Sequence, residues 1–207
     1  MFLNNSFIKA ILLLLIGFYM FSCAPAPLKD LEKQELASMK VLSSPVNFDK
    51  NGQANYRCKI EAFDQIISGV IVFKQVDDSI RVVMITDFGL KVMDINLFHD
   101  ATYQVNYIMK HIDYKFVRES FALNLFMLME KNISSGSAVF IEKDDELYYH
   151  QDMIFYQKEN QTIKVERYRG KNKLIAIAKI QKSAIIDIQQ FNPKMTMTLS
   201  PLDHAER

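Results

Sequence analysis

Apolar and polar residues alternate with a period of two through most of this chain, and this pattern constrains the fold more than any other feature. In residues 55–62, tyrosine, cysteine, isoleucine and alanine alternate with arginine, lysine and glutamate, which is typical of a strand with one buried face. Similar segments follow, separated by short turns such as Asp87-Phe88-Gly89. They cover residues 66–76, 80–86, 90–97, 103–109, 138–143, 146–157, 162–169, 173–181, 184–190 and 194–199. We therefore expect one antiparallel meander of roughly ten strands.

The period changes once, over residues 115–131. Val117, Phe121, Leu125 and Leu128 follow one another at spacings of four, four and three, which predicts a helix with a wide apolar face. Such a helix must be covered by the sheet or must itself cover the sheet. The expected fold class is therefore α+β, with a curved antiparallel sheet and one helical insertion.

The N-terminus has the layout of a secretory signal over residues 1–22. Lys9 is its only charge, and the apolar run from Ala10 to Phe21 covers 12 residues, whereas a membrane-spanning helix needs roughly 20. The sequence Met20-Phe21-Ser22-Cys23 resembles the lipobox of bacterial lipoproteins, although Phe21 departs from the usual small residue. An ordinary cleaved signal with an incidental cysteine is the alternative.

The lipobox resemblance implies that the mature chain begins at Cys23 and carries diacylglycerol on the thiol of that cysteine. Two or more acyl chains hold a protein stably on a bilayer. Ala24 follows the cysteine, and by the sorting rule of enteric bacteria this favours the outer membrane. We expect a lipid-anchored protein that faces the periplasm.

Residues 23–48 are predicted to be a tether, and residues 49–207 a single folded domain. Pro25, Pro27 and Pro45 lie in this tether, and loose helical spacing of apolar residues predicts a short helix within Leu28–Leu42.

Composition excludes several classes of function. The chain has 25 basic and 24 acidic residues, which gives no basic surface for nucleic acid. The four histidines are scattered without metal-ligand spacing, and the motifs of hydrolases, metalloproteases and kinases are absent or lack their context. With Cys23 acylated, Cys58 has no partner for a disulfide and is expected to point inward. We predict a monomer that is not an enzyme and has no cofactor besides the lipid on Cys23.

Residues 68–97 resemble the lipoprotein-localisation factors of Gram-negative bacteria, which are the periplasmic carrier LolA and the outer-membrane receptor LolB. The resemblance rests on Phe73-Lys74-Gln75, on Asp77-Asp78 and on Phe88-Gly89-Leu90. Residues 185–190 and 192–197 resemble the closing strands of the family. Asp87 stands where the family has a proline, and Phe73 where it has a tryptophan. The resemblance implies an incomplete β-barrel around an apolar cavity, closed by a helical lid.

Two functions are left open by the sequence. In the first, the protein binds acyl chains of lipoproteins or other lipids in the cavity, with Phe121, Leu125 and Leu128 on the lid. Phe88 would then contact cargo or membrane, although it could also simply pack at a hairpin edge. In the second, the protein is a structural or adaptor lipoprotein whose own side chains fill the barrel. An acyl chain of about 16 carbons gains roughly 12 kcal/mol on leaving water, so the first function requires vacant apolar space.

Overall fold

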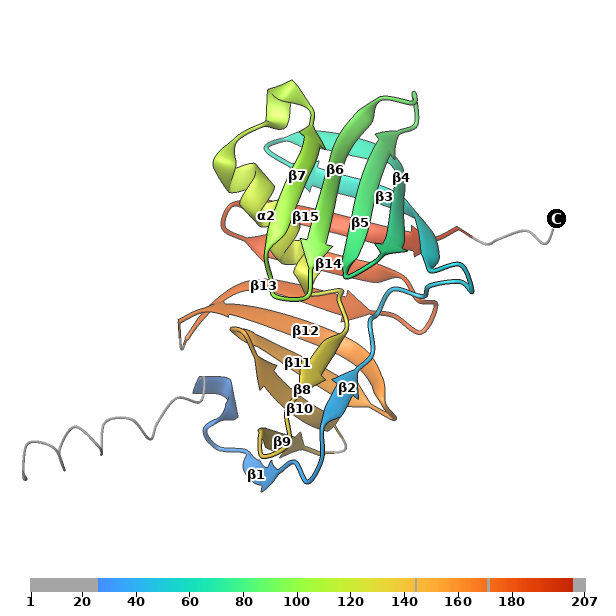
Figure 1. Ribbon diagram of the computed structural model, residues 1–207. Coiled ribbons are helices and arrows are strands. Elements are labelled where there is room, and N and C mark those ends of the chain that lie inside the picture. The colour runs from blue at the N-terminus through green and yellow to red at the C-terminus, as the bar shows by residue number, and fades with distance from the viewer. Residues whose placement is uncertain (1–25, 144, 171, 203–207) are drawn as a thin grey trace, which may run out of the picture.

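The computed structural model describes residues 26–143, 145–170 and 172–202, which form fifteen strands, one α-helix and two short 3-10 helices (Figure 1). The first half contains η1 (Ala26–Leu28), β1 (Glu32–Glu35), β2 (Lys40–Leu42), β3 (Gln53–Ala62), β4 (Gln65–Val76), β5 (Ser79–Thr86), β6 (Lys91–Phe98), β7 (Tyr103–Ile108), η2 (Lys110–Ile112) and α2 (Lys115–Phe126). The second half contains β8 (Lys131–Ile133), β9 (Ala138–Glu142), β10 (Asp145–His150), β11 (Met153–Lys158), β12 (Gln161–Arg169), β13 (Lys173–Ile180), β14 (Ile186–Phe191) and β15 (Lys194–Pro201). Within these described ranges, no helix combines the length and the hydropathy that crossing a bilayer requires.

Thirteen of the strands form one curved, antiparallel sheet in the order β1-β9-β10-β11-β12-β13-β14-β15-β3-β4-β5-β6-β7. Most neighbours are consecutive hairpins, but β15 pairs with β3 and so joins the end of the chain to its first half. In Figure 1, β3–β7 and α2 form one end of the molecule, and β9–β12 form the other. A second sheet consists of β2 and β8.

The alternation in the sequence has the predicted structural effect on β3. Tyr56, Cys58 and Ile60 are almost completely buried, whereas Arg57, Lys59 and Glu61 are exposed. Because partners in an antiparallel ladder point to the same face, inward positions can be followed from strand to strand. One such row crosses the sheet through Met153, Arg167, Ala176, Gln190, Met195, Ala62 and Gln65.

α2 packs against this inner face, and its buried residues belong to the same apolar cluster as the inward residues of the sheet. The prediction of one helix inserted in a large antiparallel sheet is confirmed. The helix ends at Phe126, five residues before the predicted end at 131. Met127, Leu128 and Met129 are buried in a tight turn whose backbone bonds span three residues. Buried residues in such a turn have the same apolar pattern as a helix, which explains why the predicted C-terminal end of the helix was wrong.

The strand predicted over 146–157 is also wrong as a single element. It is two strands, β10 and β11, joined by a turn at Gln151 and Asp152. Both turn residues have positive φ, 48° and 62°, in positions where glycine or asparagine is usual. Without those residues, the sequence carried no turn signal.

The helix predicted within Leu28–Leu42 is wrong, because this region forms two strands. β1 pairs with β9, and β2 pairs with β8. Leu28 is buried on the outer face of the sheet with Phe140, Leu147 and Ile154, and Leu42 is buried in the main core. From Ala26 onward, much of the segment that we expected to be a tether is therefore packed against the domain.

Close approach of β4 and β5 depends on Gly69. A Cβ atom at this position would lie 2.0 Å from the carbonyl oxygen of Ile85 and 2.7 Å from the Cα atom of Thr86. Any other residue must therefore push β5 away from β4.

We predict that Gly69→Ala lowers the free energy of unfolding by about 3 kcal/mol, because the clash is with backbone atoms that cannot rotate away. Denaturant titration measures the change. Gly170→Asn is the control, because a Cβ atom there has open space and asparagine tolerates the left-handed backbone. Equal stability of Gly69→Ala and the unsubstituted chain would contradict the packing of β4 on β5.

Candidate functional site

A pocket of about 250 Å³ opens at one end of the sheet, where the N-terminal half of α2 faces β3, β4 and β15. Ile60, Ile67 and Met195 line it from the sheet, and Val117 and Phe121 line it from the helix. Ala62 also contributes to the lining, and its small side chain leaves space on the sheet side. The lining is mostly apolar, as in sites that bind apolar ligands.

Three partly exposed aromatic rings surround the mouth of this pocket. Phe63 lies in the β3–β4 turn, and Tyr114 and Phe116 lie at the start of α2. The ring of Phe116 meets Phe63 edge to face at 5.7 Å between centroids and stacks on Tyr114 at 5.8 Å. The mouth is therefore an apolar surface continuous with the pocket.

Phe63 is held in an unfavourable backbone conformation. The two-residue turn between β3 and β4 consists of Phe63 and Asp64, with φ of 53° and 59°. Glycine and asparagine are the usual residues in such turns, and a bulky residue at positive φ is strained. Nine other non-glycine residues of the described chain also have positive φ. At Phe63 this conformation places an aromatic ring at the pocket.

The predicted lid residues separate into two groups. Phe121 is buried and lines the pocket. Leu125 and Leu128 are 0% and 1% exposed and belong to the main core, outside the pocket lining. C-terminal to Phe121 the helix is therefore packed into the main core, and the pocket lies beneath the first two turns of α2.

A buried polar cluster begins at the inner end of the pocket. Ser120 lines the pocket, and its hydroxyl oxygen accepts a hydrogen bond from Gln190 Nε2 at 3.1 Å. Gln190 Oε1 is 3.5 Å from Arg167 Nη2, which also donates to Asn124 Oδ1 at 3.3 Å. Arg167 is 5% exposed and forms no ion pair with a carboxylate in the described part of the chain. Burial, with a smaller contribution from Arg169, lowers the pKa of Arg167 to about 10.

Phe88 lies in the β5–β6 turn and is 93% exposed. Its neighbour Asp87 fixes the turn by bonding to Arg57 Nη1 at 2.6 Å and to the Ser68 hydroxyl at 2.7 Å. Phe88 does not line the pocket, and its side chain projects into solvent. Cys23 lies outside the described residues, so its lipidation stays a prediction.

Two other buried charged residues lie outside the pocket lining. Asp94 is held by two bonds from Arg81, at 2.9 and 2.7 Å, which lower the pKa of its carboxyl to about 2. Lys131 is buried against the ring of Phe126, and burial lowers the pKa of this lysine to about 8. Among residues 26–143, 145–170 and 172–202, no three His, Cys, Asp or Glu side chains are grouped to hold a metal ion.

The sequence predicted Phe121 but not the rest of this site. An aromatic residue in a two-residue turn was the signal that could have revealed Phe63. Nothing in the sequence marks Arg167, because Glu166 and Arg167 are adjacent charges in one strand and either could have pointed inward.

Comparisons with known proteins found similarity among solved structures alone. No protein-family model matches the sequence, and no curated protein matches it. Among solved structures, the chain resembles a domain named as an outer membrane lipoprotein-sorting protein from Vibrio parahaemolyticus, with 8% identity and a TM-score of 0.41 over 77% of this chain and 88% of that chain. It also resembles a DUF1329 family protein from Desulfovibrio piger, with 4% identity and a TM-score of 0.42 over 75% of this chain and 85% of that chain.

The environment of Cys58 predicts an unreactive thiol. Its side chain is completely buried, and burial raises the pKa of the thiol to about 12. Because the thiolate is the reactive form, we expect no alkylation by iodoacetamide in the folded chain at mildly alkaline pH. In residues 24–207 Cys58 is the only cysteine, so mass spectrometry reads the result directly. The same chain in guanidinium chloride should gain one adduct, and an adduct on the folded chain would contradict the burial of β3.

Proposed function

We propose that this protein is a lipid-anchored lipoprotein of the outer membrane that binds an acyl chain without catalysing a reaction. The observation that carries the proposal is the apolar pocket beneath the first two turns of α2, which the protein's own side chains leave vacant. Lipoproteins and other lipids both present such chains, and the pocket would shield one from water. Its helical wall would serve as a lid whose movement admits the chain.

The size of the pocket indicates how the chain would bind. Sites for drug-sized ligands measure roughly 300–1,000 Å³, so a pocket of about 250 Å³ holds only part of a long acyl chain. Each methylene that leaves water contributes about 0.8 kcal/mol. The remaining methylenes would lie along the aromatic mouth formed by Phe63, Tyr114 and Phe116, which is partly exposed to water in this structure.

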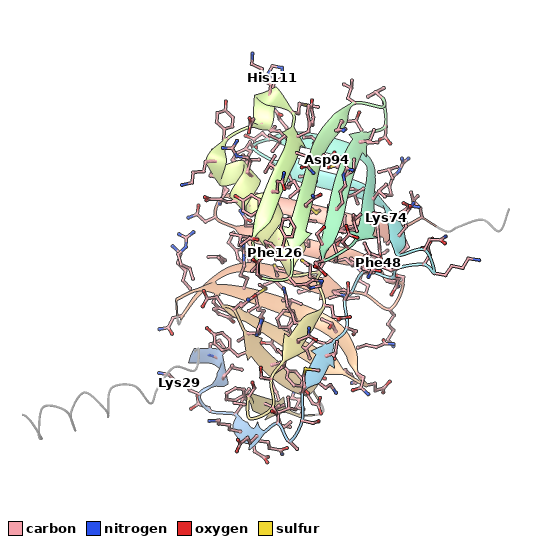
Figure 2. The ribbon with its side chains drawn as sticks, viewed as in Figure 1. Lys29, Phe48, Lys74, Asp94, His111 and Phe126 are labelled. Atoms are coloured by element: carbon pink, nitrogen blue, oxygen red, sulfur yellow. The ribbon has the colours of Figure 1, made fainter. Side chains whose placement is uncertain are left out.

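η1, the first described element, and the pocket lie in opposite halves of the molecule. Figure 2 shows Lys29, next to η1, at the lower left and His111, which lines the pocket, at the top. Cys23 precedes Ala26 by three residues, which span at most about 10 Å. A lipid on Cys23 would therefore hold the η1 end near the membrane and direct the pocket mouth away from it. This orientation favours cargo arriving through the periplasm.

A structural or adaptor function is the second candidate, and the burial of Leu125 and Leu128 favours it. These residues fill the inner face of the sheet below the pocket. In that case the exposed aromatic mouth would dock an envelope protein, and the pocket would hold no lipid.

We predict that residues 24–207, which include every described element, retain phospholipid or acylated peptide when purified from cells. Native mass spectrometry detects the bound mass. Ala62→Phe should lower the bound fraction about tenfold, because the larger ring occupies the pocket from the sheet side.

Lys59→Phe is the matched control, since Lys59 is exposed and points outward from the same strand. It should leave the bound fraction unchanged. A chain that carries no lipid from any preparation, and takes up none when acyl chains are added, would favour the adaptor function.

The two exposed turn aromatics give a second test. Phe63→Asn should weaken binding of a fluorescent acyl probe about tenfold, because Phe63 forms part of the mouth, while asparagine tolerates the left-handed backbone and preserves the turn. Phe88→Asn should leave the dissociation constant unchanged but slow transfer of the probe to lipid vesicles. Equal affinity in Phe63→Asn and the unsubstituted chain would remove the aromatic mouth from the site. Unchanged transfer in Phe88→Asn would remove Phe88 from the mechanism.

A further inference from the structure

Arg167 is a buried cation whose donors are largely unused. Among the described residues, its Nε and Nη1 atoms have no hydrogen-bond partner, and Nη2 has contacts of 3.3 and 3.5 Å to Asn124 and Gln190. Asn124 Nδ2 is buried and unpartnered as well. Both amides are neutral, so neither compensates the charge. A buried guanidinium is normally matched by an anion, because isolated charges are strongly destabilised in a protein interior.

The position of Arg167 connects it to the pocket. The inward row across the sheet places Arg167, Ala176, Gln190 and Met195 on successive strands, which are about 5 Å apart. Ala176 is small, so the arginine side chain extends over it to Gln190. Gln190 is therefore one strand from Met195, which lines the pocket.

The helix gives the same connection from the other side. Ser120 and Asn124 are four residues apart and share one face of α2. Ser120 lines the pocket and bonds Gln190, and Asn124 bonds Arg167. The polar residues thus form a continuous path from the apolar pocket to the guanidinium.

We propose that Arg167 binds the carboxylate of an anionic amphiphile, such as a fatty acid, whose hydrocarbon chain occupies the pocket. The inference rests on the proposed function, and it specifies the ligand class. The carboxylate replaces Gln190 Oε1 as the partner of the guanidinium, since that contact is the longest in the cluster. Gln190 Nε2 retains Ser120 and the Pro193 carbonyl as partners. A single carboxylate matches the single charge of Arg167.

The test compares an acid with the corresponding alcohol. The full-length chain in phosphatidylcholine nanodiscs is exposed to a photoactivatable fatty acid or to the fatty alcohol of equal length, and labelled peptides are identified by mass spectrometry. We expect the acid to label pocket peptides that contain Phe121 or Met195 at least tenfold more than the alcohol does. In Arg167→Met this preference should disappear while labelling by the alcohol persists. The acid and the alcohol partition differently between bilayer and water. Each variant meets both probes in the same bilayer, so this difference is the same for every variant and cancels when the ratios of acid to alcohol labelling are compared.

Arg169→Met is the control, since Arg169 is exposed two residues further along the same strand, and it should keep the preference for the acid. Arg167→Met should fold, because the substitution removes a buried charge that has no ionic partner, and an isolated charge is costly in a protein interior. Arg167→Lys keeps the charge but not the planar donor group, and should give an intermediate preference.

The outcomes separate this inference from the function on which it depends. Equal labelling by acid and alcohol, unchanged in Arg167→Met, would overturn the carboxylate site and leave acyl binding intact, with water satisfying Arg167. Labelling of pocket peptides by neither probe would overturn acyl binding itself.

Discussion

A strongly curved sheet of thirteen strands has an inner face that another part of the chain must cover, and in the described residues α2 is the only α-helix that does so. Its twelve residues are too short to cover the whole face. The C-terminal part of the helix and the turn after it are buried in the main core through Leu125 and Leu128. The N-terminal part lies over Ala62, whose side chain cannot fill the space. The pocket is the consequence of one helix covering a sheet larger than itself.

Two exceptions to ordinary folding rules lie at or next to that pocket. Phe63 is strained at the mouth, and Arg167 is buried without a carboxylate at the inner end. Asp94, by contrast, accepts hydrogen bonds from Arg81 and Asn106. Exceptions also occur outside the pocket, because positive φ recurs at other turns and Lys131 is buried beside the ring of Phe126. What connects Phe63 and Arg167 is the pocket itself, which Phe63 lines and which Arg167 reaches through Gln190 and Ser120.

Much of the fold could be predicted from the sequence, because alternation reports directly which residues of a strand point inward. It identified the strands β3–β7, β9 and β12–β15 and the helix, but not the turn at Gln151 and Asp152, which lacks glycine and asparagine. β1 and β2 were missed because strands of three or four residues are too short to show a period. The site was less predictable than the fold. Ser120, Gln190 and Arg167 meet only through strand register, which a single sequence does not specify.

The central claim is that space beneath the first turns of α2 is vacant and apolar, and xenon tests it most directly, because the gas enters such cavities without chemical preference. Crystals of residues 24–207 grown without added lipid would be pressurised with xenon. We predict a bound atom in contact with Ile67, Val117 and Phe121. Crystals in which these side chains touch one another, with no xenon between them, would contradict the account.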